Sequence, residues 1–348
     1  MKIAGLEKEF IIVGENVHTT RIVRLKGKRV VDNSDGVQSV RYFDADKNPL
    51  YLEIPEKIKS TQDYEEGRVK HVKIAVQTAM SGEGAAQSRG LHYLHHLIRR
   101  QVNNGADFLD LNVDEVSLRL DDQKTAIQWL VRMAQEVSPI PLSIDSSNIE
   151  IIQAGLEACD NRAGRPLLNS ASLERIEALD LAVQHETRAI VTAAGESGMP
   201  QNAEERLTNA SRMVDAALAK GLAPANLYID PLVFPISVDK DFGNHCFEAI
   251  RQLREKYGPE IHISGGFSNV SFGLPCRRII NDAFFILAIE AGADSGIIDP
   301  VTSNPKDVFA IDQESTPYKL AEAMLLGEDR NCKAFLRAYR NGDLTTTG

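Results

Sequence analysis

The sequence has few cysteines, few aromatic residues and no long hydrophobic run. Its four cysteines, Cys159, Cys246, Cys276 and Cys332, are scattered over 348 residues without a Cys-x-x-Cys spacing. This pattern predicts reduced thiols and excludes a disulfide framework. No run of 18 apolar residues occurs, and acidic residues interrupt the short apolar run near the start. We therefore expect neither a membrane span nor a signal peptide, and a cytoplasmic location.

Positive charge is also scarce. The chain has 39 Lys and Arg against 49 Asp and Glu, which gives a formal net charge of −10 and a pI of about 5.4. Such an excess of negative charge repels phosphate backbones, so nucleic acid is not an expected partner. With 43% hydrophobic and 25% charged residues, the composition is that of a globular protein with a sizeable core.

Several catalytic and metal-binding motifs are missing. The sequence contains no His-Glu-x-x-His, no Cys/His quartet and no Gly-x-Ser-x-Gly, so we expect no metal site and no serine-hydrolase elbow. His92, His95 and His96 share one face of a predicted helix, where a solvated or packing face is the favoured interpretation. His18 differs from them because it follows the first predicted strand directly.

Short apolar runs alternate with helical patterns along most of the chain, and runs of this kind are typical of strands buried on both faces of a parallel sheet. The predicted strands are residues 10–14, 107–112, 141–145, 166–170, 188–192, 227–230, 260–264 and 295–299. The predicted helices include residues 124–137, 149–159, 203–220 and 277–291. Eight such units predict a (β/α)8 TIM barrel as a single domain over residues 1–348. An open doubly wound sheet is the alternative, but no Gly-x-Gly-x-x-Gly follows the first strand.

Residues 19–85 interrupt this alternation after the first strand. They contain short stretches of alternating apolar and polar residues, such as VQSVRYF and PLYLEI, separated by turn-forming sequences. This predicts an inserted β-rich excursion at the barrel mouth, because loops that follow strands emerge on that side. Residues 80–86 (MSGEGAA) predict a flexible hinge before the next helix.

Nearly every predicted strand ends in a carboxylate, amide or hydroxyl group. These positions hold Glu15, Asp110, Asn112, Asp145, Asn169, Asp230, Ser268, Asn269 and Asp299. A single aspartate there could be a helix cap, but strand ends converge at the mouth of a barrel. Carboxylates accept pairs of N–H donors and amides both donate and accept, so this set fits a small heterocycle rich in N–H groups.

The same segments resemble the pterin-binding methyltransferase family, which includes methyltetrahydrofolate:corrinoid protein methyltransferases and the folate-binding barrel of cobalamin-dependent methionine synthase. The resemblance is carried by FLDLNVDEVS, by YIDPLVFP and above all by GGFSNVSFGLPCRRIINDAFFILAIEAGADSGIIDP, residues 265–300. It covers residues 10–18 and 86–300 and implies a TIM barrel of one-carbon metabolism.

The resemblance also implies roles for individual residues. Asp145, Asn169 and Asp230 would bind the pterin ring, and Asp110 and Asn112 would line its site. The remaining ligand-binding positions that it implies are Glu15, Gly266, Ser268 and Arg277.

Asn269 is the residue that we expect to act in catalysis. N5 of methyltetrahydrofolate cannot leave as an amide anion, and an amide whose hydrogen bond to N5 strengthens in the transition state would assist its departure. The resemblance implies Co(I) of a corrinoid as the nucleophile. Because no Asp-x-His-x-x-Gly string is present, a separate corrinoid-binding protein would supply it. Homodimers are common in the family.

Two features depart from the family, and three other functions compete with the one it implies. Residues 19–85 have no counterpart in compact members, and His18 stands where the family has Asn. Dihydropteroate synthase chemistry would need a basic anion site after the first strands. The second alternative is a corrinoid-dependent methyltransferase that takes the methyl group from a quaternary amine or a methoxylated compound. A quaternary amine would need an aromatic cage. Folate storage without catalysis would need no residue at N5.

Overall fold

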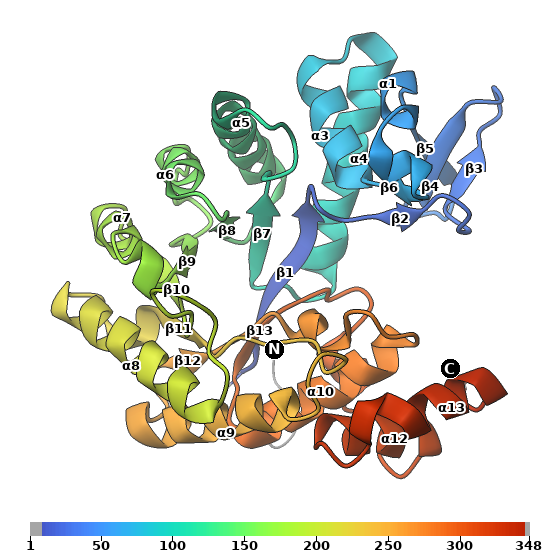
Figure 1. Ribbon diagram of the computed structural model, residues 1–348. Helices are drawn as coiled ribbons and strands as arrows, with labels where there is room; N and C mark the ends of the chain where they lie inside the picture. Colours follow the sequence, from blue (N-terminus) through green and yellow to red (C-terminus); the bar gives the residue numbers. More distant parts are fainter. Residues whose placement is uncertain (1–8, 345–348) are drawn as a thin grey trace. The chain divides into compact units, whose positions relative to one another are not determined.

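Eight parallel strands alternate with helices along the chain (Figure 1). The computed structural model describes residues 9–344. The strands are β1 (Ile11–His18), β7 (Phe108–Asn112), β8 (Leu142–Asp145), β9 (Leu167–Ala171), β10 (Arg188–Thr192), β11 (Leu227–Asp230), β12 (His262–Ile263) and β13 (Ser295–Ile298). Each lies within or overlaps one of the eight predicted runs, and β1 extends past its run to His18.

The strands form one sheet in the order β12-β11-β10-β9-β8-β7-β1-β13. Hydrogen bonds also join the two ends of this order. Asp294 N donates to Ile263 O over 3.2 Å, and Ile297 N donates to Gly265 O over 2.9 Å. The predicted (β/α)8 barrel is therefore confirmed.

Amphipathic helices follow the strands. They are α4 (Gly84–Asn103), α5 (Leu120–Val137), α6 (Ile149–Glu157), α7 (Ala178–Gln184), α8 (Ala203–Ala219), α9 (Phe242–Tyr257) and α10 (Arg277–Ala291). The chain continues through α11 (Pro305–Val308), α12 (Thr316–Leu325) and α13 (Lys333–Asn341), with short 3-10 turns at η1 (Leu173–Arg175), η2 (Pro224–Asn226), η3 (Phe267–Ser271) and η4 (Arg330–Cys332).

Aromatic side chains pack together in the core next to β13. Phe10 packs edge-on against Phe285 with ring centroids 4.9 Å apart, and Phe267 contacts both rings. A Cβ atom at Gly296 would lie 3.1 Å from the Phe267 ring and 3.2 Å from the Phe10 ring. The glycine in β13 thus makes room for aromatic side chains of a well-packed core.

Residues 19–85 contain two small antiparallel sheets and three helices. Strands β3 (Val30–Asp32), β4 (Gln38–Phe43) and β5 (Pro49–Glu53) form one sheet, and β2 (Val23–Arg24) pairs with β6 (Arg68–Val69). The helices are α1 (Glu56–Lys59), α2 (Gln62–Glu65) and α3 (His71–Ser81).

The flexible hinge predicted at residues 80–86 is wrong. Met80 and Ser81 end α3, and α4 begins at Gly84. At Gly82 a Cβ atom would lie 2.3 Å from Thr78 O, so a glycine is needed for the chain to turn directly from one helix into the next.

A network of rings attaches this segment to α4. Tyr42 of β4 packs edge-on against Tyr93 with centroids 4.8 Å apart, and its hydroxyl lies 2.9 Å from His92 Nδ1. The ring of His96 lies 4.9 Å from that of Tyr42, and the Tyr93 hydroxyl contacts His71 Nδ1 at 2.8 Å. His92 and His96 of α4 therefore take part in packing, one of the two interpretations that the sequence pattern favours.

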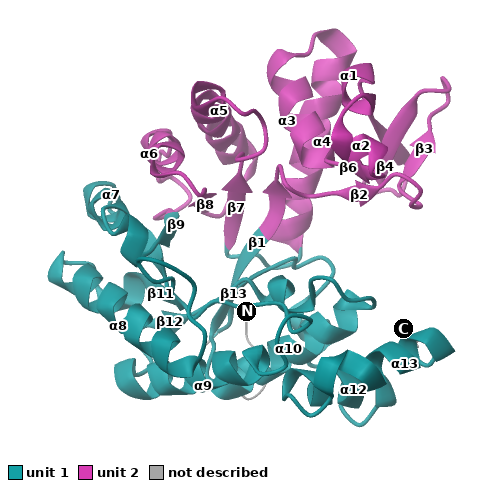
Figure 2. Cartoon of the chain, in the orientation of Figure 1, with its two compact units in different colours: residues 1–14, 104–107, 167–348 teal, residues 15–103, 108–166 magenta. Residues whose placement is uncertain are grey.

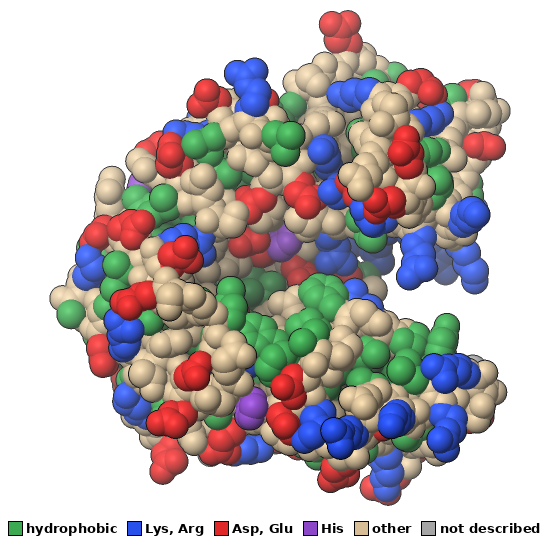
Figure 3. All heavy atoms as spheres, viewed as in Figure 1, with side chains coloured by type: hydrophobic (Ala, Val, Ile, Leu, Met, Phe, Trp, Pro, Cys, Tyr) green, Lys and Arg blue, Asp and Glu red, His purple; other side chains and the backbone are tan. Residues whose placement is uncertain are grey.

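By its internal contacts the chain divides into two compact units, coloured separately in Figure 2. Unit 1 contains residues 1–14, 104–107 and 167–348, and unit 2 contains residues 15–103 and 108–166. On the face shown in Figure 3, acidic and basic side chains are interspersed. Within residues 9–344, no helix combines the length and the apolar character needed to cross a membrane.

Candidate active site

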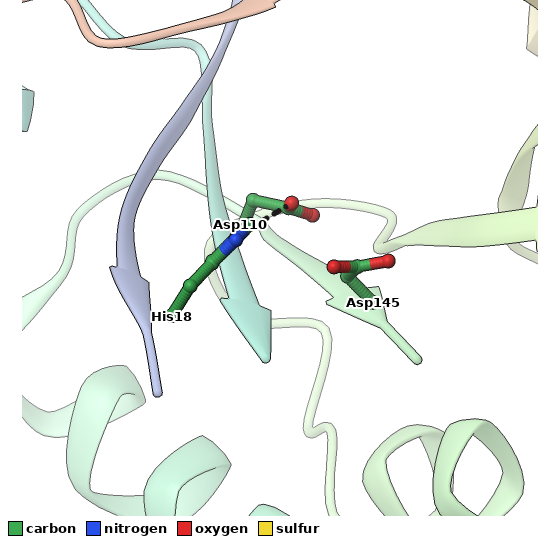
Figure 4. Close-up of side chains that lie close together, drawn as sticks. All are labelled: His18, Asp110 and Asp145. Carbon is green, nitrogen blue, oxygen red and sulfur yellow. Dashed lines mark hydrogen bonds and ion pairs between the residues drawn. The ribbon is translucent and has the colours of Figure 1, made fainter. Parts of the chain in front are cut away.

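Three titratable side chains meet at strand ends of unit 2. His18 at the end of β1, Asp110 in β7 and Asp145 at the end of β8 direct their side chains toward one another (Figure 4). His18 Nε2 lies 2.8 Å from Asp110 Oδ2. One potential ligand atom from each of the three side chains lies within 4.8 Å of the other two.

Asn112 links this group to the loop that follows β7. Its Nδ2 donates to Asp145 Oδ2 over 2.9 Å, while its Oδ1 accepts the backbone N–H of Asp114 over 3.0 Å. With both ends of the amide engaged, its orientation is fixed. One carboxylate oxygen of Asp145 thus already accepts a hydrogen bond from a neutral amide.

Asp114 in turn holds the chain just after β8. Its carboxylate accepts hydrogen bonds from Ser146 Oγ at 2.5 Å and from Ser147 N and Oγ at 2.9 Å. These bonds fix the residues directly after Asp145, which makes Asp114 a supporting residue of the site.

The helix-cap interpretation does not apply to Asp145. Helix α6 is capped by Asn148, whose side chain accepts the N–H of Glu150 over 2.8 Å. The Asp145 carboxylate instead meets Asn112 of the neighbouring strand, so it is available at the strand end. Asp299, in contrast, accepts the N–H of Val301 in its own loop over 3.0 Å, a local turn contact.

Burial and like charge shape the ionisation of this group. Burial raises the pKa of Asp145, and the negative charge of Asp110 raises it further, while His18 and Asn112 act in the opposite sense. Burial opposes the charge on His18, but its hydrogen bond with Asp110 and the carboxylates of Asp110, Asp145 and Glu15 outweigh that effect and raise its pKa.

Glu15 lies in β1 and pairs with the start of residues 19–85. Arg21 Nη1 donates to Glu15 O over 3.3 Å and lies 3.5 Å from Glu15 Oε1. The acid that was predicted to follow strand one therefore lies within β1, and its side chain is near an arginine.

A second set of predicted residues gathers at strand ends of unit 1, around Gly265 and Gly266. A Cβ atom at Gly265 would lie 3.3 Å from Asp230 Oδ1, and one at Gly266 would lie 2.9 Å from Asn269 Nδ2. The Asp230 carboxylate and the Asn269 amide thus each lie close to the backbone of one of two adjacent glycines. Only glycine permits this close approach of backbone and amide.

Asp230 and Asn169 are both largely buried strand residues, exposed by 9% and 8%. Asp230 Oδ1 accepts the N–H of Leu232 over 2.8 Å. Burial raises the pKa of Asp230 to about 6, against the lowering effects of that hydrogen bond and of Arg206. Arg206 is itself fully buried and packs over the Phe234 ring at 4.8 Å.

Arg277 braces the turn that carries Asn269. Its Nη2 donates to Ser268 O over 2.7 Å and its Nε to Ser271 Oγ over 2.9 Å, and the guanidinium lies over the Phe272 ring at 4.5 Å. Ser268 of η3 and Arg277 at the start of α10, both expected to contact ligand, are thus joined to each other.

The structure brings the predicted residues together in two sets, one in each unit. Glu15, Asp110, Asn112 and Asp145 lie in unit 2, and Asn169, Asp230, Gly266, Ser268, Asn269 and Arg277 lie in unit 1. Two features of the site were not predicted from the sequence. They are the contact of His18 with Asp110 and the hydrogen bonds by which Asp114 holds the residues after Asp145. The acid in DLNVD and the serines after Asp145 were the available signal for the second.

Both sets have the same chemical character. Each contains a buried carboxylate and a buried amide on parallel barrel strands, Asp110 and Asn112 in one set and Asp230 and Asn169 in the other. Such groups match a planar heterocycle that donates several N–H bonds, and buried acceptors discriminate strongly against a ligand that leaves them unpaired. The fold and these side chains define a TIM-barrel protein that carries carboxylates and amides at the ends of its strands.

Comparison with known proteins places the chain within that class. Residues 84–299 match the family described as pterin binding enzyme, and the chain belongs to this family. It is 30% identical over 258 residues to a methylcorrinoid:tetrahydrofolate methyltransferase of Eubacterium limosum, covering 70% of this chain and 86% of that protein. It is 29% identical over 218 residues to methionine synthase of Mycobacterium leprae, of which it spans only 17%.

Solved structures of similar fold are dihydropteroate synthases. The enzyme of Xanthomonas albilineans with 4-aminobenzoic acid aligns with a TM-score of 0.51 at 17% identity, covering 66% of this chain and 87% of that one. The enzyme of Yersinia pestis with a pterine–sulfa conjugate aligns with a TM-score of 0.50 at 16% identity, covering 63% and 87%. These alignments support the barrel fold.

Proposed function

We propose that this protein is a methyltransferase that moves a methyl group between N5 of methyltetrahydrofolate and the cobalt of a corrinoid bound to a separate protein. The observation that carries the proposal is the similarity to a methylcorrinoid:tetrahydrofolate methyltransferase over 70% of the chain. Membership of the pterin-binding family and the strand-end carboxylates and amides support the same proposal.

Recognition of the pterin begins with its guanidine-like edge. An amino group and a ring N–H donate in parallel, and a carboxylate can accept both. Asp145 has one oxygen engaged by Asn112, and Asp230 has one engaged by Leu232 N. Each therefore keeps acceptor capacity for a ligand. Asn169, with an amide that donates and accepts, suits the carbonyl and nitrogens of the ring.

Asn269 has the catalytic role in this proposal. The bond from carbon to N5 breaks while N5 gains electron density, so a hydrogen bond to N5 is stronger in the transition state than in the ground state. The proton that N5 takes up comes from solvent, because an amide does not yield one at neutral pH. The Asn269 side chain lies directly beside Gly266, and Arg277 fixes the backbone of the turn on which it stands. An amide held in this way loses little freedom when the substrate binds.

The remaining residues shape the site around the ring. Asp110 and His18 form a hydrogen-bonded pair, Glu15 is held by Arg21, and Gly266 and Ser268 belong to the turn before Asn269. In this proposal they line the pterin site. The corrinoid supplies the cobalt that accepts or donates the methyl group.

A corrinoid-binding protein is the partner that the proposal requires. The related methyltransferase of E. limosum is named for a methylcorrinoid substrate, and this chain contains no Asp-x-His-x-x-Gly string of its own.

An anaerobic spectroscopic assay tests the proposal. The purified protein is mixed with cob(I)alamin and methyltetrahydrofolate, and the absorbance change from cob(I)alamin to methylcobalamin is followed. We expect a rate proportional to protein concentration, and none with a quaternary amine as methyl donor. Folded protein that forms no methylcobalamin from methyltetrahydrofolate, with free or protein-bound corrinoid, would contradict the proposal.

A further inference from the structure

We propose that His18, Asp110 and Asp145 form a binding site for a divalent first-row transition-metal ion. The three side chains come from the ends of β1, β7 and β8 and point toward one another (Figure 4). They offer one imidazole nitrogen and two carboxylate oxygens, all within 4.8 Å of one another. Mixed nitrogen and oxygen donors of this kind suit Mn²⁺, Fe²⁺ or Zn²⁺.

The spacing of the ligand atoms fits a single ion. With metal–ligand distances of about 2.1 Å, neighbouring donors of an octahedron lie about 3.0 Å apart and opposite ones about 4.2 Å apart. His18 Nε2 and Asp110 Oδ2 are hydrogen-bonded at 2.8 Å, close to the separation of neighbouring donors, and an ion would replace the proton between them. The 4.8 Å limit for the whole group leaves only small side-chain adjustments for all three to reach one ion.

The charges of the group call for a cation. A carboxylate oxygen of Asp145 lies within 4.8 Å of one of Asp110, so two acids face each other beside His18. An ion bound there would replace the proton shared by His18 and Asp110 and would lie against two negatively charged carboxylates. Buried charges in proteins are generally paired or bound to metal for this reason.

Supporting hydrogen bonds already orient the proposed ligands. Asn112 Nδ2 donates to Asp145 Oδ2, and Asp114 fixes the two residues after Asp145. Outer contacts of this kind are a regular part of metal sites because they fix the direction of the ligand oxygens. The His18 side chain is 14% exposed, so solvent reaches the edge of the group.

Another histidine–aspartate pair in the chain provides a matched comparison. His262 Nδ1 lies 3.0 Å from Asp294 Oδ2, much as His18 meets Asp110. Asp294, however, also pairs with Arg254 at 2.9 Å. Among residues 9–344, three potential metal ligands lie together at His18 and not at His262.

The inference goes beyond the methyl-transfer proposal and is tested separately from it. Asp145 is also a proposed pterin ligand, so metal binding is measured on the full-length protein without folate. Mn²⁺ is the probe because it prefers oxygen and nitrogen donors and avoids the free thiols of the chain. Chelator-treated protein is titrated with Mn²⁺, and the free ion is counted by its electron paramagnetic resonance signal.

We expect one Mn²⁺ per chain, with echo-modulation from an imidazole nitrogen. His18→Asn and Asp110→Asn should each weaken binding by about a hundredfold, since even outer contacts of metal sites are worth ten- to a hundredfold. His262→Asn should bind as the parent protein does. Thermal unfolding of each variant checks that it is folded.

Two results would overturn the proposal. One is a parent protein that leaves added Mn²⁺ free at submillimolar concentrations. The other is a folded His18→Asn or Asp110→Asn variant that binds Mn²⁺ with unchanged affinity. Neither result bears on methyl transfer, which the cobalamin assay measures independently.

Discussion

The side-chain amide of Asn112 donates to the carboxylate of Asp145 over 2.9 Å, and the other end of the same amide accepts the N–H of Asp114. The orientation of Asn112 is therefore set by the backbone, and residue 145 must present an acceptor to it. An aspartate satisfies this demand with one oxygen and keeps a second oxygen for a ligand.

This relationship predicts the effect of Asp145→Asn. The new amide must turn its oxygen to Asn112, so its NH2 group would face the N–H donors of the pterin. Losing a hydrogen bond to a charged acceptor costs about 1.5–3 kcal/mol, or about ten- to a hundredfold in affinity. Titration calorimetry with methyltetrahydrofolate measures this loss.

Asp107→Asn is the matched control for that variant. Asp107 is a carboxylate just before the other end of β7, where it accepts the N–H of Ile12 over 2.8 Å, and its neutral analogue can accept the same bond. We expect unchanged pterin affinity. Equal losses in the Asp107 and Asp145 variants would show a general effect on folding instead of a ligand contact.

Replacement of Asn269 should affect catalysis more than binding. In Asn269→Ala the hydrogen bond to N5 is lost, and because that bond is strongest in the transition state, methyl transfer should fall by about ten- to a thousandfold. The dissociation constant for methyltetrahydrofolate should rise much less. Single-turnover rates and calorimetry separate the two, and unchanged transfer would remove Asn269 from the mechanism.

Gly266→Ala should disturb Asn269 without removing it. The added Cβ would lie 2.9 Å from Asn269 Nδ2, too close for the amide to remain in place. We expect a slower transfer rate, with an unfolding temperature close to that of the parent. Gly198→Ala is the control, since its Cβ would meet no atom within 4 Å. If the two alanine variants transfer methyl groups equally fast, the position of the amide is unimportant.

The buried carboxyl group of Asp230 should destabilise the folded chain at neutral pH, although it is proposed to bind the pterin. Its folded-state pKa is raised from 3.8 to about 6, so the folded chain holds this proton more tightly than the unfolded chain does. Stability is then lost as the pH rises from about 4 to about 6. Asp230→Asn should therefore be more stable than the parent above pH 6, by up to about 3 kcal/mol, and bind pterin more weakly.

Unfolding temperatures across this pH range test the prediction. The difference between Asp230→Asn and the parent should be small near pH 4 and grow to a plateau above pH 6. A variant that is less stable than the parent at neutral pH would show that the carboxylate is stabilised by partners in the folded chain.

The barrel could be predicted from sequence because buried parallel strands leave a plain signal. All five residues of β7, FLDLN, are buried, and such runs recur at intervals that leave room for helices. The two-residue strand β12 (His262–Ile263) was still found, since Ile261 and Ile263 mark the run. Helix α3 was not predicted, because glycines at positions 82 and 84 resemble a flexible linker when their contacts are unseen.

The candidate site was predictable in its residue types but not in its contacts. Aspartates and asparagines at strand ends are visible in the sequence, whereas the partner of each depends on how neighbouring strands register. Asn112 lies opposite Asp145 in the pairing of β7 with β8, which accounts for their hydrogen bond. The approach of His18 to Asp110 joins residues that are 92 positions apart, and no local pattern announces it.

A crystal structure with bound methyltetrahydrofolate tests the central claim most directly. The account predicts the pteridine ring at the carboxyl ends of the strands, with its aminopyrimidine edge donating to Asp145 and Asp230 and with Asn269 within hydrogen-bond distance of N5. A pteridine bound away from these three side chains, or none bound at saturating ligand, would contradict it.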